Sequence, residues 1–94
     1  MIDTDSKVRR NPSVVARDLT EGQGAVLLHL DSGEYHGVNP IGLAIWELLD
    51  EERTVGHVVE ALRERVEDPP ADLETDVVQF LREVADRDLV AVGR

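Results

Sequence analysis

The sequence contains no cysteine and no long apolar run, and each absence excludes a class of protein. Without cysteine the chain can form neither disulfide bonds nor thiolate metal sites. Without an apolar run of about eighteen residues, the pattern of a membrane-spanning helix is missing. The N-terminal residues also lack the apolar stretch of a secretory signal, so we expect a cytoplasmic protein. A chain of 94 residues, 41% of them hydrophobic, predicts one soluble domain with a single core.

Basic residues are scarce relative to acidic ones. Ten Lys and Arg residues face twenty Asp and Glu residues, which gives a formal net charge of −10. Residues 47–94 carry fourteen of the acids and only six of the bases. This charge opposes contact with a phosphate backbone and favours neutral or basic partners. We therefore expect no nucleic acid among the partners, and we interpret most of the acidic residues as an ordinary solvated surface.

The first half of the chain predicts a small antiparallel sheet. Residues 1–12 are polar and predict a flexible N-terminus that adds nothing to the core, so the domain is expected to span 13–94. Three short β-rich segments follow at 14–19, 25–30 and 35–38. They are too close together for crossover helices, so the sheet must be antiparallel. The hairpin turn between the last two contains Gly33, which can take a positive φ.

The second half predicts three helices. Asn39-Pro40 is a start signal for the first helix, because Asn caps exposed amides and Pro suits the first helical position. Thr54 is the expected cap of the second helix. The third should run from about 71 to 87, and 89–92 should close the chain as a strand or wing. The resulting fold class is α+β, a three-stranded antiparallel sheet followed by a three-helix winged helix-turn-helix.

No pattern in the chain indicates catalysis or a cofactor. Phosphate-binding glycine motifs and the HExxH zinc motif are both missing. If the hairpin turn has two residues at Ser32-Gly33, His29 and His36 lie opposite each other, and a bulged turn would offset them by one residue. Two imidazoles without a third ligand make a poor zinc site, so we expect no metal. The paired acids around Asp50 belong to a loop without a shared cleft that would shift a pKa.

An open strand edge is the feature that suggests a function. A three-stranded sheet whose last strand enters a helix leaves one edge unpaired, and such an edge is a template for another chain. We predict that this edge binds an extended peptide through main-chain hydrogen bonds, and that the third helix supplies apolar pockets. An edge protected only by loops is the alternative. The predicted binding surface comprises Glu34, Tyr35, His36, Gly37 and Val38 of the strand and Asp76, Val77, Phe80, Leu81 and Val84 of the helix.

Two points about this surface stay open at the level of sequence. The uncertainty about the turn leaves undecided which side chains of the strand face the helix. Replacing Val38 by proline is expected to delete a donor at the edge and weaken binding, and Phe80→Asp should weaken it through the helix. Winged helix-turn-helix proteins commonly bind DNA, but the third helix carries five acids against two arginines, which would repel a polyanion.

The string from Leu30 to Leu49, L-D-S-G-x-Y-x-G-x-N-x-x-G-x-x-I-W-x-L-L, resembles the PqqD-like family. The resemblance extends over about 14–92. It implies a RiPP recognition element, which binds the leader segment of a ribosomally made precursor peptide as an added strand, beside the third helix. The Y-x-G-x-N-x-x-G-x-x-I-W pattern is most similar to the stand-alone recognition proteins of lasso peptide biosynthesis, whose partners are a leader peptidase and a cyclase.

Three other functions compete with this prediction. The first is PqqD itself, a peptide chaperone for a radical enzyme in quinone cofactor synthesis. The second is a winged-helix DNA-binding regulator, and the third is a small structural or regulatory interaction domain. The resemblance favours a leader-binding protein that has no enzyme activity, needs no cofactor and contacts no membrane.

Overall fold

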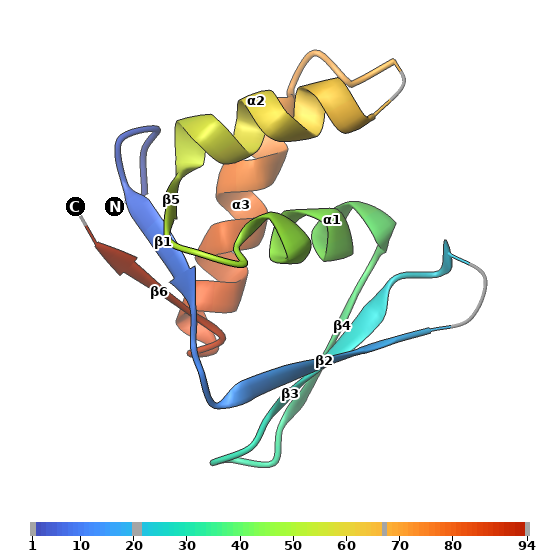
Figure 1. Cartoon of the computed structure of the whole chain (residues 1–94), viewed down its shortest axis with the longest axis vertical. Coiled ribbons are helices and arrows are strands. Elements are labelled where there is room, and N and C mark those ends of the chain that lie inside the picture. Colours follow the sequence, from blue (N-terminus) through green and yellow to red (C-terminus); the bar gives the residue numbers. More distant parts are fainter. Residues whose placement is uncertain (1, 20–21, 67, 94) are drawn as a thin grey trace.

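The computed structural model describes residues 2–19, 22–66 and 68–93 (Figure 1). The ends of the predicted N-terminal segment and of the predicted domain, residues 1 and 94, lie outside the described residues, as do 20–21 and 67. The elements are β1 (Lys7–Arg10), β2 (Val14–Asp18), β3 (Ala25–His29), β4 (Tyr35–Val38), α1 (Pro40–Leu48), β5 (Arg53–Thr54), α2 (Val55–Arg65), α3 (Leu73–Asp86) and β6 (Val90–Gly93).

The predicted α+β class is confirmed, and the strands form two sheets. Each is three-stranded and antiparallel, with the orders β5-β1-β6 and β2-β3-β4. The second is the sheet predicted from the sequence, and β4 coincides with the predicted return strand. Gly33 has the expected positive φ of 76°. In β3, the inward residues Ala25, Leu27 and His29 are buried and alternate with half-buried ones, as a one-sided sheet requires.

The predicted helix starts are confirmed by their caps. The Asn39 side-chain oxygen accepts a hydrogen bond from the Gly42 amide at 2.8 Å, directly after β4. The Thr54 hydroxyl accepts one from the His57 amide at 3.1 Å. Each cap satisfies an amide that the first helical turn leaves without a partner. Strand β4 therefore passes into α1 through a defined, hydrogen-bonded junction.

The β5-β1-β6 sheet was not predicted, and it corrects two expectations. The prediction that residues 1–12 add nothing to the core is wrong, because Val8 in β1 is completely buried. Strand β1 pairs with β6 from the other end of the chain, Lys7 opposite Gly93. The carbonyls of Thr4 and Ser6 also accept hydrogen bonds from the first amides of α2, those of Gly56 and Val55. The expected order of one sheet followed by three helices is therefore incomplete.

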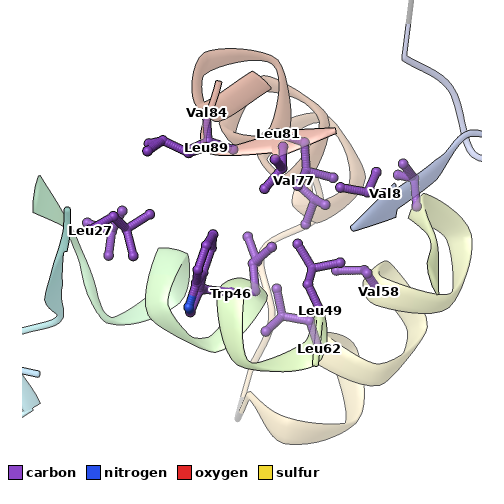
Figure 2. Packing of buried hydrophobic residues seen from close by; sticks show 14 of the residues in the cluster. Val8, Leu27, Trp46, Leu49, Val58, Leu62, Val77, Leu81, Val84 and Leu89 are labelled. Atoms are coloured by element: carbon purple, nitrogen blue, oxygen red, sulfur yellow. The ribbon is translucent and has the colours of Figure 1, made fainter. Parts of the chain in front are cut away.

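One apolar cluster joins both sheets and all three helices. Figure 2 shows Trp46 of α1 in this cluster, together with Leu27 of β3 and Val77 of α3. Trp46 is 4% exposed, so its side chain belongs to the core. Arg10 at the end of β1 lies over its ring, 5.0 Å from the ring centroid, and donates to its carbonyl. No helix among the described residues is long and apolar enough to cross a membrane.

Candidate functional site

Strand β4 is the outer strand of its sheet. It pairs with β3 on one side, with Leu28 opposite Tyr35 and Ala25 opposite Val38. Within residues 2–19, 22–66 and 68–93, no strand pairs with its other side. The open edge that the sequence predicts is therefore present, and it lies directly before α1 (Figure 1).

The hydrogen-bond alternation identifies which backbone groups point away from β3. The His29 amide donates to the Glu34 carbonyl at 3.0 Å, so this pair is a hydrogen-bonded one. In an antiparallel ladder every second pair is of this type, so His36 and Val38 also direct their backbone groups toward β3. The N–H and C=O groups of Tyr35 and Gly37 consequently point outward. The outer edge of β4 thus presents two donors and two acceptors to solvent.

This geometry corrects the expected effect of Val38→Pro. The Val38 amide points into the sheet, so proline there would remove a hydrogen bond to β3 rather than an edge donor. The position that supplies an outward donor is Gly37. An added Cβ atom at Gly37 would meet no other atom within 4 Å, so the strand has room for a substitution there.

Phe80 of α3 lies at the end of β4. A Cβ atom built on Gly42 would be 2.8 Å from Phe80 Cε1 and 3.1 Å from Val38 Cβ, so these three residues are immediate neighbours. Gly42 is the third residue of α1, and its missing side chain is what lets the Phe80 ring approach. Phe80 is only partly buried, so part of its side chain is accessible. The structure thus brings together Val38 and Phe80 of the predicted surface.

The other predicted helix residues differ in exposure. Val77, Leu81 and Val84 are all 0% exposed and form the face of α3 that packs into the core (Figure 2). Asp76, one turn before Phe80, is exposed. On α3, therefore, Asp76 and Phe80 have surface available to a partner, while the three buried residues hold the helix in place.

The predicted strand residues divide between the two faces of the sheet. His36 and Val38 lie on the same face as the buried Leu27 and Ala25, with which they pair. Tyr35 and Gly37 lie on the opposite face, and Tyr35 is 73% exposed. Glu34 precedes the strand and is exposed. The face assignment that the sequence left open is thereby decided.

The aromatic residues distinguish β4 from β2, the other outer strand of its sheet. The chain has one Trp, one Tyr and one Phe. Trp46 is in the core, whereas Tyr35 is on β4 and Phe80 lies against its end. The other outer strand of this sheet, β2, carries the charged pair Arg17 and Asp18, and charges on an edge discourage pairing with a further strand. Aromatic side chains are enriched in binding surfaces, so of the two outer strands of this sheet β4 is the better suited to a partner.

His29 belongs to a structural hydrogen-bond cluster that the sequence did not reveal. It lies opposite Glu34, while His36 pairs with Leu27, so the two histidines are offset by two residues and both predicted registers are wrong. His29 Nδ1 accepts from the amides of Asp31 and Ser32 at 3.3 and 3.4 Å. Its Nε2 therefore carries the proton and donates to Asp88, 3.1 Å away.

The same cluster ties the hairpin to the rest of the chain. Asn11 donates to the Asp88 backbone carbonyl at 2.8 Å, and its side-chain oxygen accepts from Ser13. The segments that the cluster joins are 77 residues apart in sequence, so no local motif signals it. Among the described residues, no group of three His, Cys, Asp or Glu side chains could hold a metal ion.

The loop acids after α1 form ordinary surface ion pairs. The Arg53 guanidinium donates to Asp50 at 3.1 Å, and this hydrogen bond lowers the pKa of that carboxyl below its usual value. Asp50 is exposed, and Arg53 is the largest cause of the shift, so the shift does not indicate a cleft. The same guanidinium donates to the Leu48 carbonyl at 2.7 Å, near the end of α1. These residues stabilise a helix terminus and offer no reactive site.

Comparison with known proteins gives a family and two similar structures. The family described as "Coenzyme PQQ synthesis protein D (PqqD)" matches residues 24–90. The structure described as "TbiB1 in Complex with the TbiA(beta) Leader Peptide" is 30% identical, covers 87% of this chain and 93% of that one, and has a TM-score of 0.73. A "Lasso peptide synthetase B1 complexed with the leader peptide" is 25% identical, with coverages of 89% and 96% and a TM-score of 0.69. No curated protein matches the chain.

Proposed function

Because this chain belongs to the PqqD family, we propose that it is a RiPP recognition element that binds the leader segment of a ribosomally synthesised precursor peptide. Both similar structures contain a leader peptide, and one is a lasso peptide synthetase component, which favours lasso peptide biosynthesis over quinone cofactor synthesis. The observation that carries the proposal is the outer edge of β4, where the N–H and C=O groups of two residues point outward near a partly exposed phenylalanine.

The leader adds to the sheet as a fourth strand next to β4. Its backbone pairs with the outward N–H and C=O groups of Tyr35 and Gly37, which supplies affinity independent of sequence. Its side chains alternate between the two faces, so those on the inner face lie near Val38 and Phe80. Asp76, on the same side of α3 as Phe80, favours a neutral or basic leader residue. Val77, Leu81 and Val84 act from the core, by fixing α3.

In this role the chain delivers its leader to a peptidase and a cyclase and has no enzyme activity of its own. It works in the cytoplasm, where precursor peptides are made. The three helices and β6 follow a winged helix-turn-helix arrangement that serves as a scaffold rather than as a DNA reader. The acidic α3, with Glu74 and Asp76 in its first turn, argues against a groove-binding helix.

The test is a calorimetric titration with overlapping synthetic peptides that cover the precursor encoded beside this chain's gene. One peptide from the leader is expected to bind at micromolar or lower concentration, and peptides from the core segment are not. A short DNA duplex serves as the competing probe. Failure of every precursor peptide, or salt-sensitive binding to the duplex instead, would contradict the proposal.

Proline at Gly37 tests strand addition itself. Gly37→Pro removes an outward donor while leaving the ladder with β3 intact, and Gly37→Ala is the control that keeps the donor. The loss of one hydrogen bond, about 1.5 kcal/mol, should make leader binding about tenfold weaker for the proline variant than for the alanine variant. Fluorescence of the single buried Trp46 verifies that both variants are folded. Equal affinity of the two folded variants would contradict strand addition.

A further inference from the structure

The face of the β2-β3-β4 sheet that points away from the helices carries two rows of side chains. The strand pairing defines both rows. The first row consists of Val15, Leu28 and Tyr35, and the second consists of Arg17, Val26 and Gly37. Val15 is 46% and Tyr35 is 73% exposed, and together with the half-buried Val26 and Leu28 they form a contiguous apolar patch. A mostly apolar hollow of about 380 Å³ on this face is lined by Val15, Arg17, Val26, Leu28 and Tyr35. This outer face has no cover within the described part of the chain.

Gly37 leaves a gap at the corner of this face. It pairs with the half-buried Val26 and follows Tyr35 by two positions, so all three lie on the same side of the sheet. The position of its absent Cβ has no atom within 4 Å. Its φ is not positive, so the backbone itself does not require glycine here. The gap borders the edge on which the leader is proposed to add.

A strand added to β4 would place two of its side chains on this face. If the added strand is antiparallel, the outward groups of Tyr35 and Gly37 form hydrogen-bonded pairs with the residues directly opposite, and paired residues project on the same side. The residue between those two, opposite His36, projects toward Phe80 instead. The strand spacing of about 4.8 Å lets a long side chain opposite Gly37 reach across the glycine to Val26.

We propose that Gly37 is a specificity-determining residue whose missing side chain forms a seat, bordered by Val26 and Tyr35, for one large apolar or aromatic side chain of the leader. The proposal rests on strand addition at β4 and adds a side-chain preference on the outer face. A side chain bound in this seat would cover Val26 and the side of the Tyr35 ring that borders Gly37, which removes apolar surface from water. The size of the leader side chain determines this specificity, because a side chain on residue 37 would exclude a large leader side chain from the seat.

The experiment is a size exchange between the domain and the leader. The leader peptide that binds the wild-type chain is substituted by glycine at one position at a time, and each peptide is titrated into the wild type and into Gly37→Val. Valine suits a strand, and the space around Gly37 is open, so the variant should fold. Trp46 fluorescence and thermal unfolding check this. Arg17→Ala, in the same row but two strands away, is the matched control variant.

One leader position should respond in a distinctive way. In the wild type, glycine at this position weakens binding about tenfold, the ratio that corresponds to one buried side chain. Gly37→Val weakens binding of the parent leader by a similar factor. Its affinity for the glycine-substituted leader, however, lies within about threefold of the affinity of the wild-type chain for the same peptide. Arg17→Ala shows no such coupling at any position.

The outcomes separate this inference from the proposed function. If no precursor peptide binds the wild type, both are overturned. If a leader binds and Gly37→Pro weakens it, but Gly37→Val weakens all glycine-scan peptides equally or none, strand addition stands and the seat is wrong. If the coupling appears with Arg17→Ala instead, the leader side chain lies elsewhere on the face, and the inference about Gly37 is wrong.

Discussion

Gly42→Ala is the substitution that most directly couples the packing of α1 to the proposed leader site. The added methyl carbon would lie 2.8 Å from Phe80 Cε1 and 3.2 Å from Cζ. Ordinary contacts between carbon atoms lie at about 3.5–4.0 Å, so the ring must move by roughly 0.7 Å or more. Movement away from α1 and Val38 shifts the one aromatic group that the leader is expected to contact on its inner face.

Two opposing terms determine the effect of this change on stability. Alanine in place of glycine in a helix gains up to about 1 kcal/mol. Overpacking against Phe80 costs about 1–3 kcal/mol, toward the lower end because the contact is the far end of a side chain. We expect a net loss near 1 kcal/mol, or a fall in melting temperature of roughly 4–8 °C. Leader affinity should fall about three- to tenfold, because the displaced ring no longer lies beside Val38.

Urea unfolding followed by Trp46 fluorescence measures the stability, and calorimetry with the leader peptide measures the affinity. Gly56→Ala in α2 is the control, because its nearest contact is the Thr4 carbonyl at 3.3 Å, and its leader affinity should be unchanged. In a Phe80→Leu background the clash with the ring is removed and the 3.1 Å contact with Val38 Cβ remains, so Gly42→Ala should become nearly neutral for stability. A loss of the same size in both backgrounds would refute this reasoning.

Two further predictions concern the ends of the hairpin and the N-terminal strand. Gly24→Ala should unfold the protein or lower its free energy of unfolding by about 3–5 kcal/mol, because φ is 99° and the new carbon would meet the Val38 carbonyl oxygen. Gly33→Ala, at φ 76° in open space, should cost only about 1–2 kcal/mol. Equal losses of the two variants in thermal unfolding would contradict the argument that the chain approaches Gly24 closely. Val8→Ala should lower the free energy of unfolding, measured in urea, by about 2–3 kcal/mol, because two methyl groups are lost and leave a cavity. Lys7 is exposed, so Lys7→Ala should cost less than about 0.5 kcal/mol. A Val8 variant as stable as the Lys7 variant would show that β1 adds nothing to the core.

Local signals predicted the elements that form the proposed leader site. Asn39-Pro40 and Thr54 carry their capping chemistry in single residues, so both helix starts were found from the sequence. The segment Tyr35–Val38 sits between a glycine turn and a helix cap, which defines its length at both ends. Its open edge followed from the same reasoning, because a strand that enters a helix directly has little chain left with which to cover itself.

Long-range pairing was out of reach of that reasoning. Strand β1 reads KVRR, in which one buried valine stands among three basic residues, and its partner β6 lies more than eighty positions away at Gly93. The hairpin register was missed because the His29–Glu34 hydrogen bond closes a longer turn than Ser32-Gly33 alone. Helical periodicity identified the apolar side of α3 but not what covers it, so Val77, Leu81 and Val84 were assigned to the peptide although the core occupies them.

Strand β4 is held at both ends before any peptide arrives. At its start, the Glu34 carbonyl accepts from His29, whose imidazole is tied to Asp31, Ser32 and Asp88. At its end, Asn39 caps α1, and Gly24 lets the neighbouring chain approach the Val38 carbonyl closely. A four-residue edge strand anchored in this way would lose little conformational freedom in the proposed leader complex, so the ordering cost would fall on the leader. Weakening either anchor should therefore reduce leader affinity even where every residue that contacts the peptide is unchanged.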